Sequence, residues 1–383
     1  MKKRSRSKSV GGWFIRNWHW LTVVVLVTAA AAAAVLWTVR GSRSSLHVAG
    51  QFKTSEYPVA VTGTEDEGYA LTAGGQAFTL TGWTQQSEGV ELADNATSMV
   101  LSASGRYLLV LGDRVTLLDS ALQQKWSRKT TAPSVVERGI FTTKGQVTVV
   151  YSFLADQSRQ CVTYDLAGKY LTGYKVPDFG RDAQIDLAST GTLVLTLAGG
   201  DIYTVSPDGK VIATFTVPNP GVKLAGLVSA VDPAGTRILA GYSRAVSGTA
   251  ESLPRYLFDQ TGKQVAEFTV AAENPAVRAV GTSFLLFGRS AQLIDKDGKA
   301  LWSASKLNFG VIDAASAEGV CSLLFQEETT SQTAVYYLGV YDGSTGTLLH
   351  QWSTAEAEAP RLFQLPGERS VLALATGFLV LEP

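Results

Sequence analysis

Short apolar runs, separated by small polar residues and glycine, make up most of the chain from residue 46 onward. The runs are roughly four to seven residues long or alternate apolar with polar positions, which is typical of β-strands, and Gly, Asp, Asn, Ser and Pro occupy the breaks between them. No helical period occurs in this part of the sequence. The pattern therefore predicts an all-β fold.

One hairpin pattern occurs six times: a strand, a turn on a small polar residue or glycine, and a second strand closed by an aromatic residue. The six copies are Val115–Trp126 (VTLLDSALQQKW), Val162–Tyr174, Ile202–Phe215, Tyr256–Phe268, Ala291–Trp302 and Tyr337–Trp352. They recur about every 43 residues, and a repeat of that length predicts a β-propeller, because each blade buries its faces only against neighbouring blades. A β-sandwich would require this regular spacing to be accidental.

The spacing predicts eight blades, with seven as the alternative because the first blade has the weakest repeat. The expected blades are 57–92, 96–130, 134–177, 182–217, 222–270, 275–304, 308–354 and 358–383. The last blade ends at Pro383, directly after its third strand, and Leu46–Phe52 is a strand that precedes the first blade. We expect this N-terminal strand to complete blade eight, because a propeller leaves no open strand edge at its closure.

The turns of the repeat have a consistent chemistry. An Asp at the end of a strand is suited to accept hydrogen bonds from backbone N–H groups of the turn, and glycine supplies a positive φ. The turn glycines are Gly168, Gly209, Gly262 and Gly298, and the closing aromatics expected to pack between adjacent blades are Trp126, Phe268, Trp302 and Trp352.

The first 43 residues differ sharply from the rest. They contain eight Lys and Arg residues and no acidic residue, and Leu21–Val39 is uncharged. A helix of that length spans roughly 28 Å, which matches the hydrocarbon thickness of a bilayer. Tryptophans 18, 20 and 37 bracket it, and the cations before it favour a cytoplasmic N-terminus.

We therefore expect a cytoplasmic segment at 1–20, a transmembrane helix at 21–39 in the lipid bilayer, a linker at 40–45 and an exported propeller at 46–383. A cleaved secretory signal is the alternative, since Ala29–Ala34 offers small residues for cleavage. Either interpretation exports the propeller.

The charge of the chain argues against a nucleic-acid partner, and the positions of its cysteines argue against a disulfide. The formal net charge is zero, but eight of the 33 cations lie in the first 43 residues, so the remainder carries 25 cations against 33 Asp and Glu. This acidic balance argues against a nucleic-acid partner. Cys161 and Cys321 fall on blades three and seven, too far apart for a disulfide, and we expect both to be buried.

The best copies of the repeat are Asp259–Lys263 (DQTGK), Asp295–Trp302 (DKDGKALW) and Asp342–Trp352. They resemble the quinoprotein-like and WD-like repeats, and the whole arrangement is similar to a family of bacterial single-pass membrane proteins with an exported propeller and no assigned function. The resemblance implies a fold and no activity.

No motif for catalysis stands out, so we expect a protein that is not an enzyme and has no cofactor or metal. The cysteines are too far apart for the vicinal pair common in quinone-dependent dehydrogenases, and the sequence has no Gly-x-Ser-x-Gly elbow. Histidine-based chemistry is disfavoured because only His19, His47 and His350 are present, at poor positions. The Gly-Lys pairs are hairpin turns, because they lack the spacing of a phosphate loop.

Three carboxylates on presumed innermost strands can point into the central channel: Asp182, Asp186 and Asp313. A polar channel wall is one interpretation. A carboxylate pair acting on a polysaccharide is the other, because sequence cannot measure the distance between the groups.

Three long connections between second and third strands, Ser152–Gln160, Ser243–Pro254 and Gln326–Thr333, fall on one face of the predicted ring. Length concentrated on one face of a rigid scaffold suggests a binding surface. Its candidate residues are Asp156, Arg159, Arg244, Glu251, Arg255, Glu327 and Glu328.

The sequence thus predicts a membrane-anchored propeller that acts outside the cytoplasm as a protein-interaction scaffold, with an envelope or cell-surface protein as partner. The alternatives are glycan or cell-wall polymer binding, which the loops disfavour because Phe153 is their single aromatic residue, and a polysaccharide-active enzyme.

Overall fold

The structure is a computed structural model that describes most of the chain beyond residue 43. The described residues are 44–54, 56–92, 95–130, 132–176, 183–219, 224–245, 252–271, 275–328, 334–356, 358–375 and 377–383. Ser45–Pro383 form one compact unit. In the described part of the chain, no helix is long and apolar enough to cross a membrane. The expected transmembrane helix at 21–39 lies outside the described residues.

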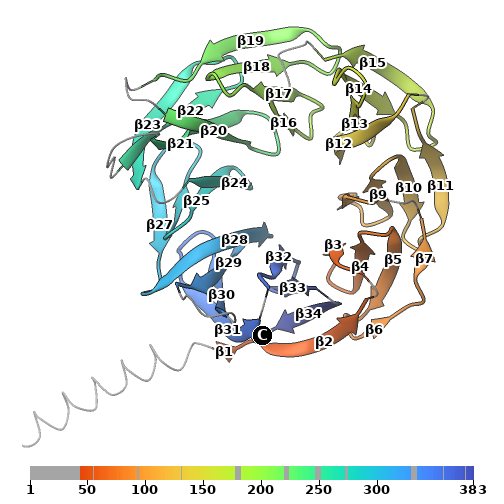
Figure 1. The fold of residues 1–383 in the computed structure, drawn as a ribbon, viewed down its shortest axis with the longest axis vertical. Helices are drawn as coiled ribbons and strands as arrows, with labels where there is room; N and C mark the ends of the chain where they lie inside the picture. Colours follow the sequence, from red (N-terminus) through yellow and green to blue (C-terminus); the bar gives the residue numbers. More distant parts are fainter. Residues whose placement is uncertain are drawn as a thin grey trace, which may run out of the picture. The chain divides into compact units, whose positions relative to one another are not determined.

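Eight antiparallel sheets form the described part of the chain, and in Figure 1 they follow one another around a ring, so the fold is an eight-bladed β-propeller. Blade one contains β3 (Pro58–Gly63), β4 (Glu67–Thr72), β5 (Gln76–Thr81), β6 (Gln85–Gln86) and β7 (Val90–Glu91). Blade two contains β8 (Ser98–Leu101), β9 (Tyr107–Leu111), β10 (Val115–Asp119) and β11 (Gln124–Arg128). Blade three contains β12 (Ser134–Phe141), β13 (Val147–Phe153), β14 (Arg159–Tyr164) and β15 (Tyr170–Lys175). Blade four contains β16 (Gln184–Leu187), β17 (Leu193–Thr196), β18 (Asp201–Val205) and β19 (Val211–Thr216).

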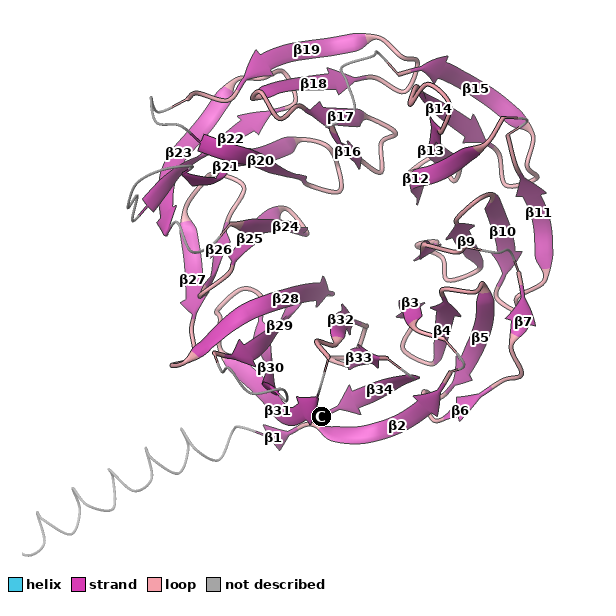
Figure 2. Cartoon of the chain, viewed as in Figure 1, coloured by secondary structure: helices cyan, strands magenta, loops and turns pink. Residues whose placement is uncertain are grey.

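The second half of the ring has the same order of strands from the centre outward. Blade five contains β20 (Leu224–Val231), β21 (Arg237–Ala245), β22 (Ser252–Asp259) and β23 (Gln264–Ala271). Blade six contains β24 (Ala276–Val280), β25 (Ser283–Phe287), β26 (Ala291–Ile294) and β27 (Ala300–Ala304). Blade seven contains β28 (Phe309–Ala317), β29 (Val320–Glu327), β30 (Ala334–Asp342) and β31 (Leu348–Glu356), with β1 (Ser44–Ser45) beside β31. Blade eight contains β32 (Arg361–Gln364), β33 (Ser370–Leu374), β34 (Gly377–Glu382) and β2 (His47–Lys53). Figure 2 shows the described part of the ring as strands joined by loops.

The two ends of the propeller meet in blade eight. β2 pairs antiparallel with β34, from His47 opposite Glu382 to Lys53 opposite Gly377. The rings of Phe52 and Phe378 stack across this pair, with centroids 4.9 Å apart. In Figure 1 the N-terminal colour of β2 therefore lies beside the C-terminal colour of β34. A strand that precedes blade one closes the ring, as the open third-strand edge of the last blade required.

The core is divided into eight clusters of buried side chains among the described residues, and each cluster lies between two adjacent blades. The closing aromatics Trp126, Phe268, Trp302 and Trp352 pack in four of these clusters, as expected. Cys161 and Cys321 are both free and buried, on β14 and β29, and burial raises the pKa of their thiols to about 11 and about 12.

Asp residues organise the turns between third and fourth strands. Asp165 Oδ1 accepts hydrogen bonds from the backbone N–H groups of Ala167 (2.9 Å) and Lys169 (2.8 Å). The equivalent carboxylates of blades two, five, six and seven do the same: Asp119, Asp259, Asp295 and Asp342. The predicted turn chemistry is confirmed, and it satisfies backbone donors that would otherwise be unpaired.

An aromatic side chain on one blade covers the turn glycine of the next. A Cβ atom at Gly168 would lie 2.6 Å from Cγ of Trp126, and one at Gly262 would lie 2.5 Å from Cδ1 of Phe215. Both glycines also have a positive φ, 80° and 84°. Two further aromatics, Tyr174 and Trp302, sit equally close to Gly209 and Gly346. The glycine is therefore required twice, for the turn and for the approach of the neighbouring blade.

The blades differ in height, by which we mean the length of their strands. Third strands β14, β22 and β30 of blades three, five and seven have 6, 8 and 9 residues. Their counterparts β10, β18 and β26 of blades two, four and six have 5, 5 and 4. In all six blades a register shift marks the end of the third strand near the turn, so the extra length lies at the opposite end. Blades three, five and seven are therefore taller than blades two, four and six, whereas the third strands β5 and β34 of blades one and eight have 6 residues each, as many as β14.

We expect Gly262→Ala to destabilise the propeller more than Gly145→Ala. Both glycines have a positive φ, but a Cβ at Gly145 has no neighbour within 4 Å. The left-handed conformation costs Ala about 1 kcal/mol at either site, and overpacking against Phe215 adds about 1–3 kcal/mol at Gly262 alone. Denaturant unfolding of both variants measures the difference. Equal losses would show that the aromatic contact contributes nothing.

Stability should fall in acid through Asp342. Hydrogen bonds from the Ser344 hydroxyl, and then from Thr345 and the backbone N–H groups, lower the pKa of Asp342 to about 2. Because the folded pKa lies below the unfolded value of about 3.9, the contribution is present above pH 4 and is lost as the pH falls toward 2.

Asp342→Asn should therefore show a shallower loss of unfolding free energy between pH 4 and 2 than the wild type. Asp66→Asn is the matched control, because its side chain accepts no hydrogen bond within the described chain. Parallel pH profiles for Asp342→Asn and the wild type would contradict the assignment.

Candidate functional site

The candidate site is the face that carries the connections between second and third strands and the connections between blades, which we call the loop face. Among the connections between second and third strands, the three longest are at 154–158, 246–251 and 328–333, in blades three, five and seven. The equivalent connections of the other blades are 73–75, 112–114, 197–200, 288–290 and 375–376. The three longest of these connections thus belong to the blades with the longer second and third strands.

Blade three carries two of the predicted site residues, Asp156, which is exposed, and Arg159, which is half-buried and bonded to neighbouring residues. Asp156 is exposed, and its carboxylate accepts a hydrogen bond of 3.0 Å from the backbone N–H of Ser158, which lowers its pKa. Arg159 is half-buried, with its Nε 3.0 Å from Glu137 Oε2 and its Nη2 3.4 Å from the carbonyl oxygen of Ala183. Arg159 therefore joins blade three to blade four.

Arg255 does not lie on the surface, contrary to the expectation from sequence. It is 1% exposed, and its Nη1 donates 2.6 Å to the carbonyl oxygen of Tyr242. Gly241 makes room for it, because a Cβ there would lie 2.7 Å from Cδ of Arg255. Burial lowers the pKa of the Arg255 guanidinium to about 10. The side chain of Arg244 and all of Glu251 lie outside the described residues.

In blade seven, the two glutamates at the end of β29 have different surroundings. Glu327 is half-buried opposite Phe309. Glu328 is exposed, its backbone N–H donates 2.8 Å to the carbonyl oxygen of Asn308, and its Oε1 lies 2.7 Å from Nη1 of Arg289 in blade six. Glu328 thus ties the long connection of blade seven to the blade six side of the loop face.

The channel carboxylates are held by different blades. Asp186 on β16 accepts from Gln184 Nε2 (2.9 Å) and lies 3.5 Å from the Ser229 hydroxyl, and burial raises its pKa. Asp313 on β28 accepts 2.9 Å from the backbone N–H of Leu362. Asp182 lies outside the described residues. Among the residues that are described, no cluster of three His, Cys, Asp or Glu could hold a metal.

Polar side chains on the inner strands connect one blade to the next. Arg138 Nε donates 3.0 Å to the carbonyl oxygen of Ile185, from blade three to four. Gln184 Nε2 donates 2.8 Å to the carbonyl oxygen of Ser229, from blade four to five. Asp313 lies 3.3 Å from Nη2 of Arg278 as well as accepting from Leu362, which joins blades six, seven and eight. These contacts favour the structural interpretation of the channel carboxylates.

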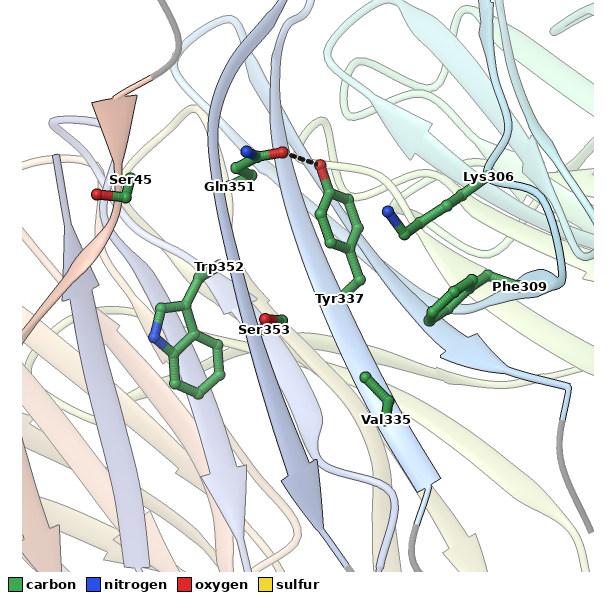
Figure 3. A pocket seen from close by; sticks show the side chains of 8 residues that line it. All are labelled: Ser45, Lys306, Phe309, Val335, Tyr337, Gln351, Trp352 and Ser353. Atoms are coloured by element: carbon green, nitrogen blue, oxygen red, sulfur yellow. Dashed lines mark hydrogen bonds between the residues drawn. The ribbon is translucent and has the colours of Figure 1, made fainter. Parts of the chain in front are cut away.

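A groove that sequence reasoning missed lies on blade seven, with a volume of about 640 Å³. Figure 3 shows its lining residues: Ser45, Lys306, Phe309, Val335, Tyr337, Gln351, Trp352 and Ser353. They come from the blade six–seven connection, β28, β30, β31 and β1. The contrast between the short hairpins of blade six and the long ones of blade seven was the sequence signal that could have located it.

Comparison with known proteins supports the fold alone. No protein-family model matches the chain, and no curated protein does. Among solved structures, the C-terminal WD40 domain of Sif2 is similar with a TM-score of 0.66 at 9% identity, over 89% of this chain and 99% of that one. The computationally designed Ika8 protein is similar with a TM-score of 0.64 at 13% identity, over 87% of this chain and 98% of that one. BamB from Moraxella catarrhalis is similar with a TM-score of 0.53 at 12% identity, over 88% of this chain and 97% of that one. These similarities show that the chain shares the β-propeller fold.

Asp313→Ala should lower the free energy of unfolding, because it leaves the Leu362 N–H and Arg278 without their carboxylate partner. An unsatisfied donor of this kind costs about 1–3 kcal/mol. Asp313→Asn retains an acceptor oxygen for Leu362 and should cost less. Urea unfolding measures both variants, and an unchanged midpoint for Asp313→Ala would rule out the inter-blade role.

Proposed function

We propose that the protein is a membrane-tethered propeller that binds another protein through its loop face, outside the cytoplasm. The membrane part of the proposal rests on the sequence of residues 1–43, with its cations and its uncharged stretch at 21–39. The cations that precede the stretch favour an N-terminus that stays inside and a propeller that is exported.

The observation that carries the interaction proposal is the uneven loop face. Blades three, five and seven are taller than blades two, four and six, and each also carries a long connection between its second and third strands. The turns of the opposite face have two to five residues, whereas the connections of blades five and seven have six. A rigid ring with variation concentrated on one face is the usual form of a recognition surface.

The surroundings of the channel carboxylates support a role without catalysis. Asp186 and Asp313 are engaged by separate sets of neighbours on different blades, and both sets hold blades together. A pair acting on a glycosidic bond would need two carboxyl groups facing one substrate.

Chemical crosslinking in intact cells, followed by mass spectrometry, tests the interaction. The test variant has the connections 154–158, 246–251 and 328–333 replaced by tight turns. The control variant carries Glu65→Ala and Lys144→Ala, two exposed residues in turns of the opposite face. Both variants must melt as the wild type does.

We expect one protein to be captured reproducibly by the wild type and by the control variant, and to be lost with the shortened connections. Capture that is absent, or that survives the shortening, would refute the loop face as the interaction surface. Retention of the propeller on a cell-wall polysaccharide instead would favour glycan binding.

A further inference from the structure

The height difference between neighbouring blades leaves part of blade seven uncovered. Third strand β26 of blade six has 4 residues, whereas β30 of blade seven has 9. Their register shifts, after Leu293 and after Val340, mark corresponding positions near the turn. The first residues of β30 therefore extend past the end of blade six on the loop face.

The uncovered wall is the side of blade seven that faces blade six. Tyr337 packs against a cluster that includes Leu285, Phe287 and Ala291 of blade six. Val335 lies two positions before Tyr337 on the same side of β30, beyond the cover of blade six, and is 37% exposed. Leu307, in the connection that leads into the blade, is 86% exposed. The groove of about 640 Å³ lies on this wall.

A lysine held over two aromatic rings supplies the charge of the groove. Lys306 Nζ lies 3.8 Å from the ring centroid of Tyr337 and 5.2 Å from that of Phe309 (Figure 3). No carboxylate of the described chain forms an ion pair with Lys306. The rings hold the ammonium group in place without neutralising its charge.

The neighbouring amide is also oriented to donate. The Tyr337 hydroxyl donates 2.7 Å to Oε1 of Gln351, so that the Gln351 amide presents its N–H₂ group as a donor. Lys306 and Gln351 thus offer hydrogen-bond donors in a groove that the apolar side chain of Val335 also lines. The complementary occupant carries an anionic acceptor next to an apolar group.

Two other occupants fit less well. Residues 1–43 precede Ser45, which lines the groove, in the sequence, but they carry eight cations and no acidic residue. A sugar would stack on an aromatic face, but Lys306 lies over the rings of Tyr337 and Phe309, and Trp352 packs against the cluster between blades seven and eight. A protein segment satisfies both the charge and the apolar requirement.

We propose that the blade-seven groove binds an acidic segment of the partner protein. A carboxylate of Asp or Glu contacts Lys306 and Gln351, and an adjoining large apolar side chain packs on Val335. This assignment rests on the proposed function. It specifies the chemistry of the partner's segment and the part of the loop face that binds this segment.

A library of phage-displayed linear peptides, selected on the full chain in detergent micelles, tests the proposal. We expect the enriched peptides to share Asp or Glu beside a large apolar residue. Binding of a synthetic enriched peptide, measured by fluorescence anisotropy, should weaken as salt is raised. It should also weaken by about tenfold or more in Lys306→Glu, where the charge-assisted contact becomes repulsive.

Two variants make the result specific. Lys306→Met keeps the stem of the side chain over the rings and removes the charge, so it should weaken binding while melting normally. Lys299→Glu makes the same charge reversal as Lys306→Glu at an exposed turn of blade six on the opposite face, and should bind as the wild type does. Enriched peptides without acidic residues, equal binding by Lys306→Glu, or competition by an oligo-uronate at comparable concentration would each overturn the assignment.

The two proposals fail separately in the crosslinking experiment. A partner that is lost with the shortened connections but kept by Lys306→Glu would remove the groove and leave the loop face as the interaction surface. No captured partner at all would remove the interaction proposal itself. Self-association of the chain through the groove would appear as concentration-dependent dimers that Lys306→Glu dissolves, which would also overturn the proposal.

Discussion

The close approach of an aromatic ring on one blade to the turn glycine of the next is the contact on which the ring depends. One geometry repeats at four junctions: Trp126 over Gly168, Tyr174 over Gly209, Phe215 over Gly262 and Trp302 over Gly346. Each sheet buries its faces only against its neighbours, and the core is accordingly eight separate clusters. A contact that recurs at these junctions sets how closely successive blades pack, and it does so without a disulfide among the described residues.

The two faces of the propeller have different tasks. At the face opposite the loop face, Asp side chains and positive-φ glycines recur in the turns of several blades, and an aromatic ring of the preceding blade covers the glycine at four junctions. At the loop face, strand length and connection length vary between neighbours. The regular face therefore fixes the frame, and the variable face is free to change without disturbing the contacts that keep the ring together.

Most of the fold could be predicted from the sequence because the repeat carries its own structural chemistry: an Asp that bonds the turn, a glycine with positive φ and an aromatic residue. Closure of the ring by the N-terminal strand could be predicted because blade eight lacks a fourth strand of its own at the C-terminal end. Blade one was ambiguous because its outermost pairing is divided between the two-residue strands β6 and β7. The positions of the long connections were also predictable, since strand boundaries mark them.

The parts of the site that escaped prediction depend on contacts between strands distant in sequence or on different blades. Arg255 looks like a surface charge in sequence, and only its position beside Gly241 on the adjacent strand explains its burial. The blade-seven groove arises because one blade is longer than its neighbour, a comparison that no single repeat contains. The inner-strand contacts of Asp313 likewise require the neighbouring blades to be placed first.

Closure through β2 and β34 has a consequence for the order of folding. These strands pair the earliest and the latest segments of the propeller, so the contact spans almost the whole length of the domain. Contacts of such high sequence separation form slowly, because the entropy of closing the loop is lost before the contact is gained. During synthesis β2 has no partner until Gly377–Glu382 has been made, and the ring can become a cooperative unit only when the last residues of the chain are available.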